Sequence, residues 1–144
     1  MDTSKEYVKM CDCSEIQDEW ETSVGDFYAL KDSPHTRMYW CEEIGSVKVA
    51  SAVLKDIVLW HGGPFKDKDE VTWLPRQDQL QDMVRDKEIC IHKEPGMKWC
   101  LWLETDEMGP KEMLYFETPE QLWLSFVMKE IFNKTWNGET WIEI

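Results

Sequence analysis

The stretch that decides the fold is TPEQLWLSFVMKEIFN, residues 118–133. Thr118 is a good N-cap residue, Pro119 suits the first turn of a helix, and Gln121 stands at the capping-box position. The apolar residues that follow would lie on nearly every side of such a helix. A helix that is apolar on most sides packs on more than one face. The stretch therefore predicts a central helix that ends near Asn133.

Strand-like segments precede this helix, and a hairpin follows it. The strand-like segments are residues 88–92, 98–104 and 112–117. Turn dipeptides, Pro95-Gly96 and Gly109-Pro110, separate them, which favours antiparallel pairing. Asn137-Gly138 lies between two short Trp-containing runs and predicts a small terminal hairpin. Together these elements predict an α+β fold, a small antiparallel sheet packed with two to four helices, in a single globular domain over residues 1–144.

The first half of the chain gives weaker signals. Ser14 and Gln17 form a capping-box pattern that predicts a short helix near 15–21. Phe27 to Leu30 is a strand-like apolar run. Trp73-Leu74-Pro75-Arg76-Gln77 predicts the start of a surface helix, with Pro75 in its first turn. The narrow apolar face of that helix consists of Leu80, Met83 and Val84.

Residues 36–60 leave two alternatives open. The segment Thr36 to Cys41 favours a strand, although Ser33 as a cap with Pro34 in the first turn would also suit a helix. From Val47 to Trp60 the apolar residues follow a helical stripe, but many are β-branched, so two strands remain an alternative.

The net charge of −13 narrows the classes of partner. Residues 1–72 carry 15 acidic and 8 basic side chains, and residues 73–144 carry 14 and 8, so the excess belongs to the whole chain. Such a field repels nucleic acid and anionic lipid and attracts basic proteins. The hydrophobic fraction of 42% is sufficient for a core, so the acidity does not indicate disorder.

Cysteines and hydropathy predict a cytoplasmic location. No run approaches the roughly 20 apolar residues that span a bilayer, and residues 1–13 lack the apolar region of a signal peptide. The five cysteines are odd in number and are expected to be reduced thiols. The nine tryptophans predict a Trp-heavy core with one or two partly exposed rings, which is where Trp serves binding.

Zinc is the first chemistry that the residues suggest. Cys11 with Cys13, and Cys90 with His92, are both pairs spaced by two, and on a strand each pair would point the same way. Together they would offer four ligands, but the Cys-x-x-Cys spacing typical of zinc sites is absent. Reduced thiols and a surface histidine are the ordinary alternative, and no cofactor is predicted.

Other catalytic chemistry has little support. His61 precedes Gly62-Gly63, but no nucleophile motif accompanies it. Acidic clusters can serve metal-dependent hydrolysis, but in so acidic a chain they arise by chance and usually mark solvated loops. The clusters are Asp67, Asp69 and Glu70, and Glu104, Asp106 and Glu107. Nucleotide-binding glycine motifs and a basic strip for nucleic acid are absent. The sequence therefore favours a binding protein over an enzyme.

Several stretches of the chain are distinctive: residues 10–13 and 15–17 with Trp20 and 25–27, WLPRQDQLQ at 73–81, EQLWLSFVMKE at 120–130, and 136–139 with Trp141. In these stretches the chain resembles a group of small phage and prophage proteins of Gram-positive bacteria. The stretches cover about half of the chain, and residues 31–72 and 88–117 carry little of the likeness. The resemblance implies an accessory gene of a mobile element that acts in the host cytoplasm, and it carries no catalytic residue.

The combined expectation is a non-enzymatic binder of a basic host protein, with a counter-defence role such as inhibition of a nucleic-acid-binding protein. The candidate contacts are Trp73, Arg76, Gln77, Asp78 and Gln81. One alternative is a binder of a nucleotide signal, in which tryptophans stack on the base and Arg76 or Arg85 meets phosphate. A second alternative is a small metal-dependent hydrolase. Direct nucleic-acid binding and membrane binding are not expected.

Overall fold

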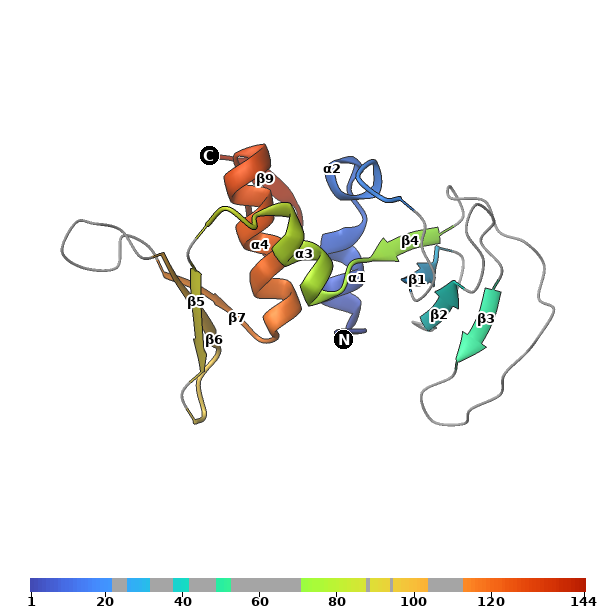
Figure 1. Cartoon of the computed structure of the whole chain (residues 1–144), viewed down its shortest axis with the longest axis horizontal. Helices are drawn as coiled ribbons and strands as arrows, with labels where there is room; N and C mark the ends of the chain where they lie inside the picture. Colours follow the sequence, from blue (N-terminus) through green and yellow to red (C-terminus); the bar gives the residue numbers. More distant parts are fainter. Residues whose placement is uncertain are drawn as a thin grey trace. The chain divides into compact units, whose positions relative to one another are not determined.

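The computed structural model describes residues 1–21, 26–31, 38–41, 49–52, 71–87, 89–93, 95–103 and 113–144. The chain forms two compact units (Figure 1): an N-terminal unit, Thr3–Arg76, and a C-terminal unit, Met1–Asp2 with Gln77–Ile144. Each contains helices and antiparallel strands, so the predicted α+β class is confirmed. The single domain over 1–144 stays a prediction, because a division by contacts does not say whether the units fold separately.

The predicted central helix is α4, Pro119–Phe132, in the C-terminal unit. The Thr118 hydroxyl accepts a hydrogen bond from the Gln121 N–H at 3.2 Å, and Asn133 ends the helix in the left-handed conformation. Every residue from Glu120 to Met128 is buried. The burial on all sides confirms that α4 is the core of its unit.

A buried carboxylate secures the first turn of α4. One oxygen of Asp2 accepts hydrogen bonds from the Thr118 hydroxyl at 2.6 Å and from the Gln121 side-chain amide at 2.8 Å. The N-terminal ammonium lies 2.9 Å from the Glu120 carboxylate. The Gln121 side-chain amide therefore donates to Asp2, while the Gln121 N–H donates to the Thr118 hydroxyl as the predicted capping box requires. An acidic group at this end of a helix also interacts favourably with the helix dipole.

The other elements of the C-terminal unit pack around α4. Helix α3, Gln77–Met83, contacts α4 and buries Leu80. The sheet β5-β6-β7 comprises Ile89–Lys93, Trp99–Leu103 and Met113–Phe116, all antiparallel. A hairpin of β8, Lys134–Trp136, and β9, Trp141–Glu143, follows α4. The predicted strands and terminal hairpin are thus confirmed.

The N-terminal unit is a four-stranded antiparallel sheet with two short helices. The strand order is β3-β2-β1-β4, formed by Val49–Ala52, Met38–Cys41, Phe27–Leu30 and Val71–Leu74. Helix α1, Lys5–Cys11, and helix α2, Ser14–Gln17, both contact β4. The sequence did not predict α1, although the Ser4 hydroxyl caps it by accepting from the Tyr7 N–H at 3.1 Å.

Two sequence predictions in this unit need correction, and one open alternative is resolved. Of the helix and the strands that residues 47–60 left open, the structure forms a strand at Val49–Ala52, where all four residues pair with β2; residues 53–60 lie outside the described residues. The strand predicted at 36–41 is confirmed for Met38–Cys41. The helix predicted near 15–21 is only Ser14–Gln17, with Cys13 at the N-cap position.

The second correction concerns Pro75. Trp73 and Leu74 end β4, and α3 begins only at Gln77, so Pro75 joins a strand to a helix instead of opening the helix. Because proline disfavours helical geometry in the residue before it, it suits this junction equally well. In the described part of the chain, no helix combines the length and the apolar character that a membrane span requires.

Candidate functional site

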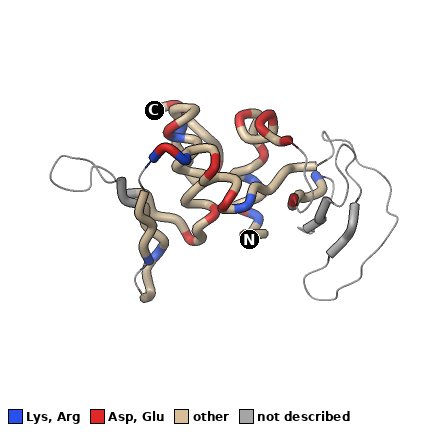
Figure 2. The backbone as a smooth tube through the Cα atoms, viewed as in Figure 1, with Lys and Arg blue, Asp and Glu red and all other residues tan. Residues whose placement is uncertain are grey.

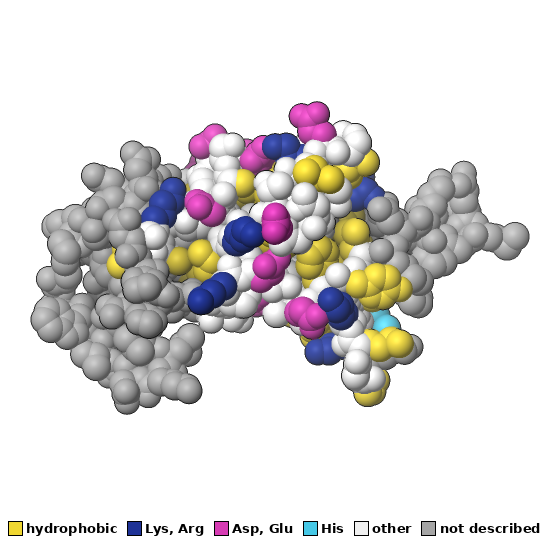
Figure 3. Space-filling view, turned by 180° about the vertical axis from the view of Figure 1, so that it is seen from behind, with side chains coloured by type: hydrophobic (Ala, Val, Ile, Leu, Met, Phe, Trp, Pro, Cys, Tyr) yellow, Lys and Arg dark blue, Asp and Glu magenta, His cyan; other side chains and the backbone are white. Residues whose placement is uncertain are grey.

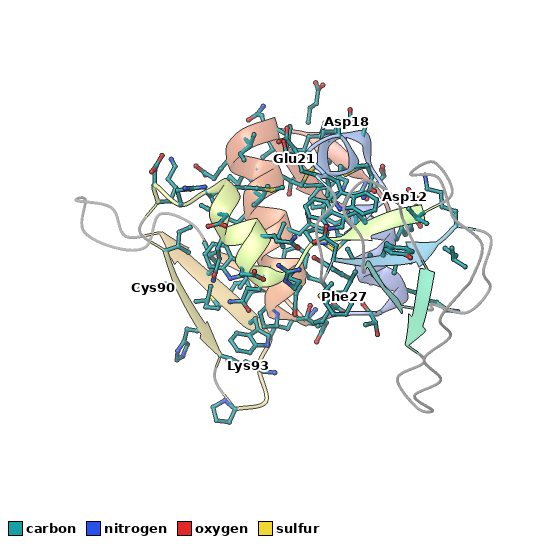
Figure 4. The ribbon with its side chains drawn as sticks, turned by 45° about the vertical axis from the view of Figure 1, so that its right-hand side comes forward. Asp12, Asp18, Glu21, Phe27, Cys90 and Lys93 are labelled. Carbon is teal, nitrogen blue, oxygen red and sulfur yellow. The ribbon has the colours of Figure 1, made fainter. Side chains whose placement is uncertain are left out.

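The clearest surface feature of the N-terminal unit is a run of carboxylates, here called the acidic segment, residues 12–21. Asp18, Glu19 and Glu21 are all exposed. They follow the C-terminal end of α2, where Figure 2 shows acidic positions, and Figure 4 labels Asp18 and Glu21 there. Among the described residues, no basic side chain forms an ion pair with these three groups. Asp12, in contrast, lies 3.6 Å from Lys31 and accepts from the Thr72 hydroxyl at 3.2 Å.

The inner side of the acidic segment is held by the core. Ile16 is fully buried and Trp20 is 3% exposed. Gln17 lies beside the edge strand β4, where its side-chain oxygen accepts from the Trp73 N–H at 2.8 Å and its amide donates to the Trp73 carbonyl at 3.1 Å. The same amide donates to the Cys11 carbonyl at 2.8 Å. The carboxylates therefore project from an anchored backbone.

A second anchor is a buried network around Asp26. The Asp26 side chain is fully buried and accepts from the Trp20 indole N–H at 2.9 Å. Arg76 lies 3.4 Å from the other carboxylate oxygen, with its own side chain 31% exposed. The Trp20 ring stacks on Trp73, with 6.0 Å between centroids and 4° between planes. The network offsets the cost of burying a carboxylate, which is large for an unpaired charge.

We expect Gln17→Ala to lower the free energy of unfolding by about 1–3 kcal/mol, because it leaves the partly buried Trp73 N–H without an acceptor. Chemical denaturation would measure the change. Gln81→Ala is the matched control, since Gln81 is half-buried on α3 and alanine favours helix. That control should stay within about 0.5 kcal/mol of the native chain. An equal loss in both variants would contradict the anchoring role of Gln17.

Of the predicted contact residues, Trp73 is buried and Arg76 is only partly exposed. Trp73 is 3% exposed in β4, so it does not stand exposed at a helix start. Arg76 faces the buried Asp26. The nucleotide alternative requires an accessible tryptophan that can stack on the base. Trp20, Trp73 and Trp123 are buried, so these three rings give the alternative no support. Among the remaining tryptophans with described side chains, Trp99, Trp136 and Trp141 are half-buried, which is more than the one or two partly exposed rings that the sequence predicted.

The other three predicted contacts lie on α3 in the C-terminal unit. Gln77 and Gln81 are half-buried, and Asp78 is exposed. Leu80 and Val84 are buried, as the predicted apolar face requires, and Met83 is half-buried. A binding role for Gln77, Asp78 and Gln81 stays a prediction. The face of the molecule in Figure 3 shows acidic and basic side chains interspersed, without a basic patch over its described part.

The zinc prediction assumed that both pairs of ligands lie on strands, and only one pair does. Cys11 is the last residue of α1 and fully buried, and Cys13 is the N-cap of α2, so this pair is not on a strand. Cys90 and His92 do lie on β5, both exposed (Figure 4 labels Cys90). Within the described ranges, no group of three or more His, Cys, Asp and Glu side chains has the arrangement to hold a metal ion. A four-ligand site formed by these residues stays a prediction.

The remaining candidates from the sequence lie outside the described residues. These are His61 with Gly62-Gly63 and the clusters Asp67, Asp69, Glu70 and Glu104, Asp106, Glu107. Sequence reasoning missed the acidic segment, although a signal was present. Between Met10 and Leu30 the chain contains six acidic side chains and no lysine or arginine.

Comparison with models of known protein families, with curated proteins and with solved structures finds no match to this chain. The residues and their geometry therefore carry the functional argument.

Proposed function

We propose that the protein is a non-enzymatic accessory protein of a phage or prophage that binds a basic surface of a host protein in the cytoplasm. The observation that carries the proposal is the acidic segment, in which Asp18, Glu19 and Glu21 are exposed on a backbone that Gln17 and Trp20 hold in place. The net charge of −13 extends the same electrostatic sign over the rest of the chain.

Anchoring matters because binding costs conformational entropy. A flexible acidic tail would lose freedom when it met its partner, whereas a segment already held by the core loses less. Among the described residues, no salt bridge to these three carboxylates must break before they contact a cation. The long-range field of the chain would speed encounter with a basic protein, and salt would weaken it.

The proposed context is counter-defence. The resemblance of residues 73–81 and 120–130 to phage and prophage proteins supports a mobile-element origin. The nucleic-acid groove of a defence nuclease is one such basic surface in the host, because these grooves contain many lysine and arginine side chains that bind phosphates. A protein that occupies the groove would inhibit the nuclease. Closely spaced carboxylates offer the same sign of charge as phosphates, so inhibition of a nucleic-acid-binding protein is the role that we propose.

We expect a variant with Asp18→Asn, Glu19→Gln and Glu21→Gln to bind such a partner about tenfold more weakly, since three exposed pairs at about 0.5 kcal/mol each amount to about 1.5 kcal/mol. The partner would be isolated by affinity capture from a lysate of a Gram-positive host at low salt, and binding would then be measured with the purified protein. The slope of affinity against salt should also become shallower.

The matched control removes three exposed carboxylates from the C-terminal unit: Asp82→Asn, Asp86→Asn and Glu139→Gln. It changes the net charge equally, so it separates a local contact from the general field. Retained binding in this control with lost binding in the acidic-segment variant supports the proposal. Equal binding by both variants, or capture that ignores salt, contradicts it.

A further inference from the structure

In the hairpin between β8 and β9, two backbone N–H groups donate to the side-chain carbonyl of one asparagine. The hairpin loop begins with Asn137-Gly138, and the side-chain oxygen of Asn137 accepts two backbone hydrogen bonds: from the Glu139 N–H at 2.8 Å and from the Thr140 N–H at 2.9 Å. Both donors lie at the distances at which enzymes stabilise an oxyanion. They polarise the carboxamide carbonyl of Asn137.

The neighbouring nucleophile is accessible. Gly138 is exposed, and its N–H donates to no acceptor in the described part of the chain. A Cβ built on Gly138 would meet no heavy atom within 4 Å outside the two neighbouring residues, so the space beside its Cα is open to solvent. The side-chain amide of Asn137, which would be the leaving group, also donates no hydrogen bond among the described residues.

We propose that Asn137-Gly138 is a self-modifying site at which the loop promotes its own deamidation. Hydroxide removes the Gly138 amide proton, and the nitrogen attacks the Asn137 side-chain carbonyl carbon. A bond forms between these atoms, the bond from that carbon to the amide nitrogen breaks, and the protonated nitrogen leaves as ammonia. One water then opens the cyclic imide at either carbonyl, which gives aspartate or isoaspartate. One water is consumed and one ammonia released, with no change of oxidation state.

Deamidation of Asn137 changes both the charge of the side chain and the length of the loop backbone. A neutral amide becomes a carboxylate, so the chain gains one negative charge. Isoaspartate also adds one carbon to the backbone of a loop that joins Trp136 to Trp141, whose rings lie 5.0 Å apart. The modification is independent of the proposed binding function.

Asn133 supplies an internal control, because it is the only other asparagine of the chain. Its side-chain amide donates to the Ile144 carbonyl at 3.1 Å, which restrains the leaving group. The residue after it, Lys134, has a side chain and belongs to β8. The structure therefore assigns fast conversion to Asn137 and not to Asn133.

The test is incubation of the full chain at mildly alkaline pH, followed by peptide mass spectrometry and isoaspartate detection. We expect Asn137 to convert at least about tenfold faster than Asn133, at a rate that rises about tenfold per pH unit. We also expect Asn137 to convert faster in the native chain than in the same chain unfolded in guanidinium chloride, where the two N–H donors are lost. Slower conversion in the native chain overturns the proposal.

A pair of glycine variants tests the nucleophile. Gly138→Ala places a side chain next to the attacking nitrogen and should slow conversion of Asn137. Gly96→Ala is the control, because Gly96 also has a positive φ and open space around it. That substitution imposes similar backbone strain elsewhere and should leave the rate at Asn137 unchanged. Equal rates at Asn137 in both variants overturn the proposed attack.

Discussion

Phe126→Ala is expected to lower the free energy of unfolding by about 3–5 kcal/mol, the largest effect of any single substitution considered for this chain. Phe126 is 1% exposed in the middle of α4, and its ring lies edge-on to Trp123 with 6.2 Å between centroids. Truncation removes apolar contacts and leaves a cavity that the surrounding elements fill only in part. Thermal or chemical denaturation would measure the loss.

The control for Phe126 lies on the same helix. Ile131 is 49% exposed in the last turn of α4. Ile131→Ala loses little packing and gains helix propensity, so its stability should stay within about 1 kcal/mol of the native chain. If the two alanine variants lost similar amounts of stability, α4 would not be the core of its unit.

Asp26→Ala is expected to lower the free energy of unfolding by about 2–4 kcal/mol. The substitution removes the acceptor of the buried Trp20 indole N–H and the partner of Arg76. An orphaned buried donor costs about 1–3 kcal/mol, and loss of hydrogen bonds to a charged group adds to this. Because Arg76 is partly exposed, it can turn toward water, which keeps the loss below that of a fully buried ion pair.

Asp26→Asn separates shape from charge at the same position. The amide keeps an oxygen that can accept from Trp20, so only the charge-assisted part of the network is lost. We expect a destabilisation about half that of Asp26→Ala. A stability of Asp26→Ala within about 1 kcal/mol of the native chain would show that the network does not hold the acidic segment.

Local signals explain which elements the sequence predicted. Thr118, Pro119 and Asn133 mark the ends of α4 through capping and backbone geometry, which local sequence encodes. Asn137-Gly138 determines its hairpin in the same way. These are the places where sequence and structure agree most closely. The contact of Asp2 with the first turn of α4 is a long-range addition that local sequence does not report.

Long-range pairing explains the errors. Val49–Ala52 is a strand because β2 lies beside it, and no local pattern reports that neighbour. Trp73 was expected on the surface because Pro75 follows it, but its pairing with Tyr28 in β1 makes it part of a buried strand. A proline near a helix start is compatible with both arrangements.

The sequence predicted that the chain is acidic, but it did not predict where the candidate site lies. The excess of acidic residues was evident, but its location on residues 12–21 depends on which side chains face the core. Gln17 reads as a capping residue in the sequence, yet its side chain crosses to the backbone of Trp73, 56 positions away. Contacts of that kind cannot be deduced from spacing.

The most direct test of the proposed function is the dissociation constant of the captured host protein at several salt concentrations, measured with three purified chains. These are the native chain, the Asp18→Asn/Glu19→Gln/Glu21→Gln variant and the Asp82→Asn/Asp86→Asn/Glu139→Gln control. We predict that the native and control chains bind with a similar affinity that falls as salt rises, and that the acidic-segment variant binds about tenfold more weakly at low salt. Equal affinity of all three chains, independent of salt, would contradict the proposal.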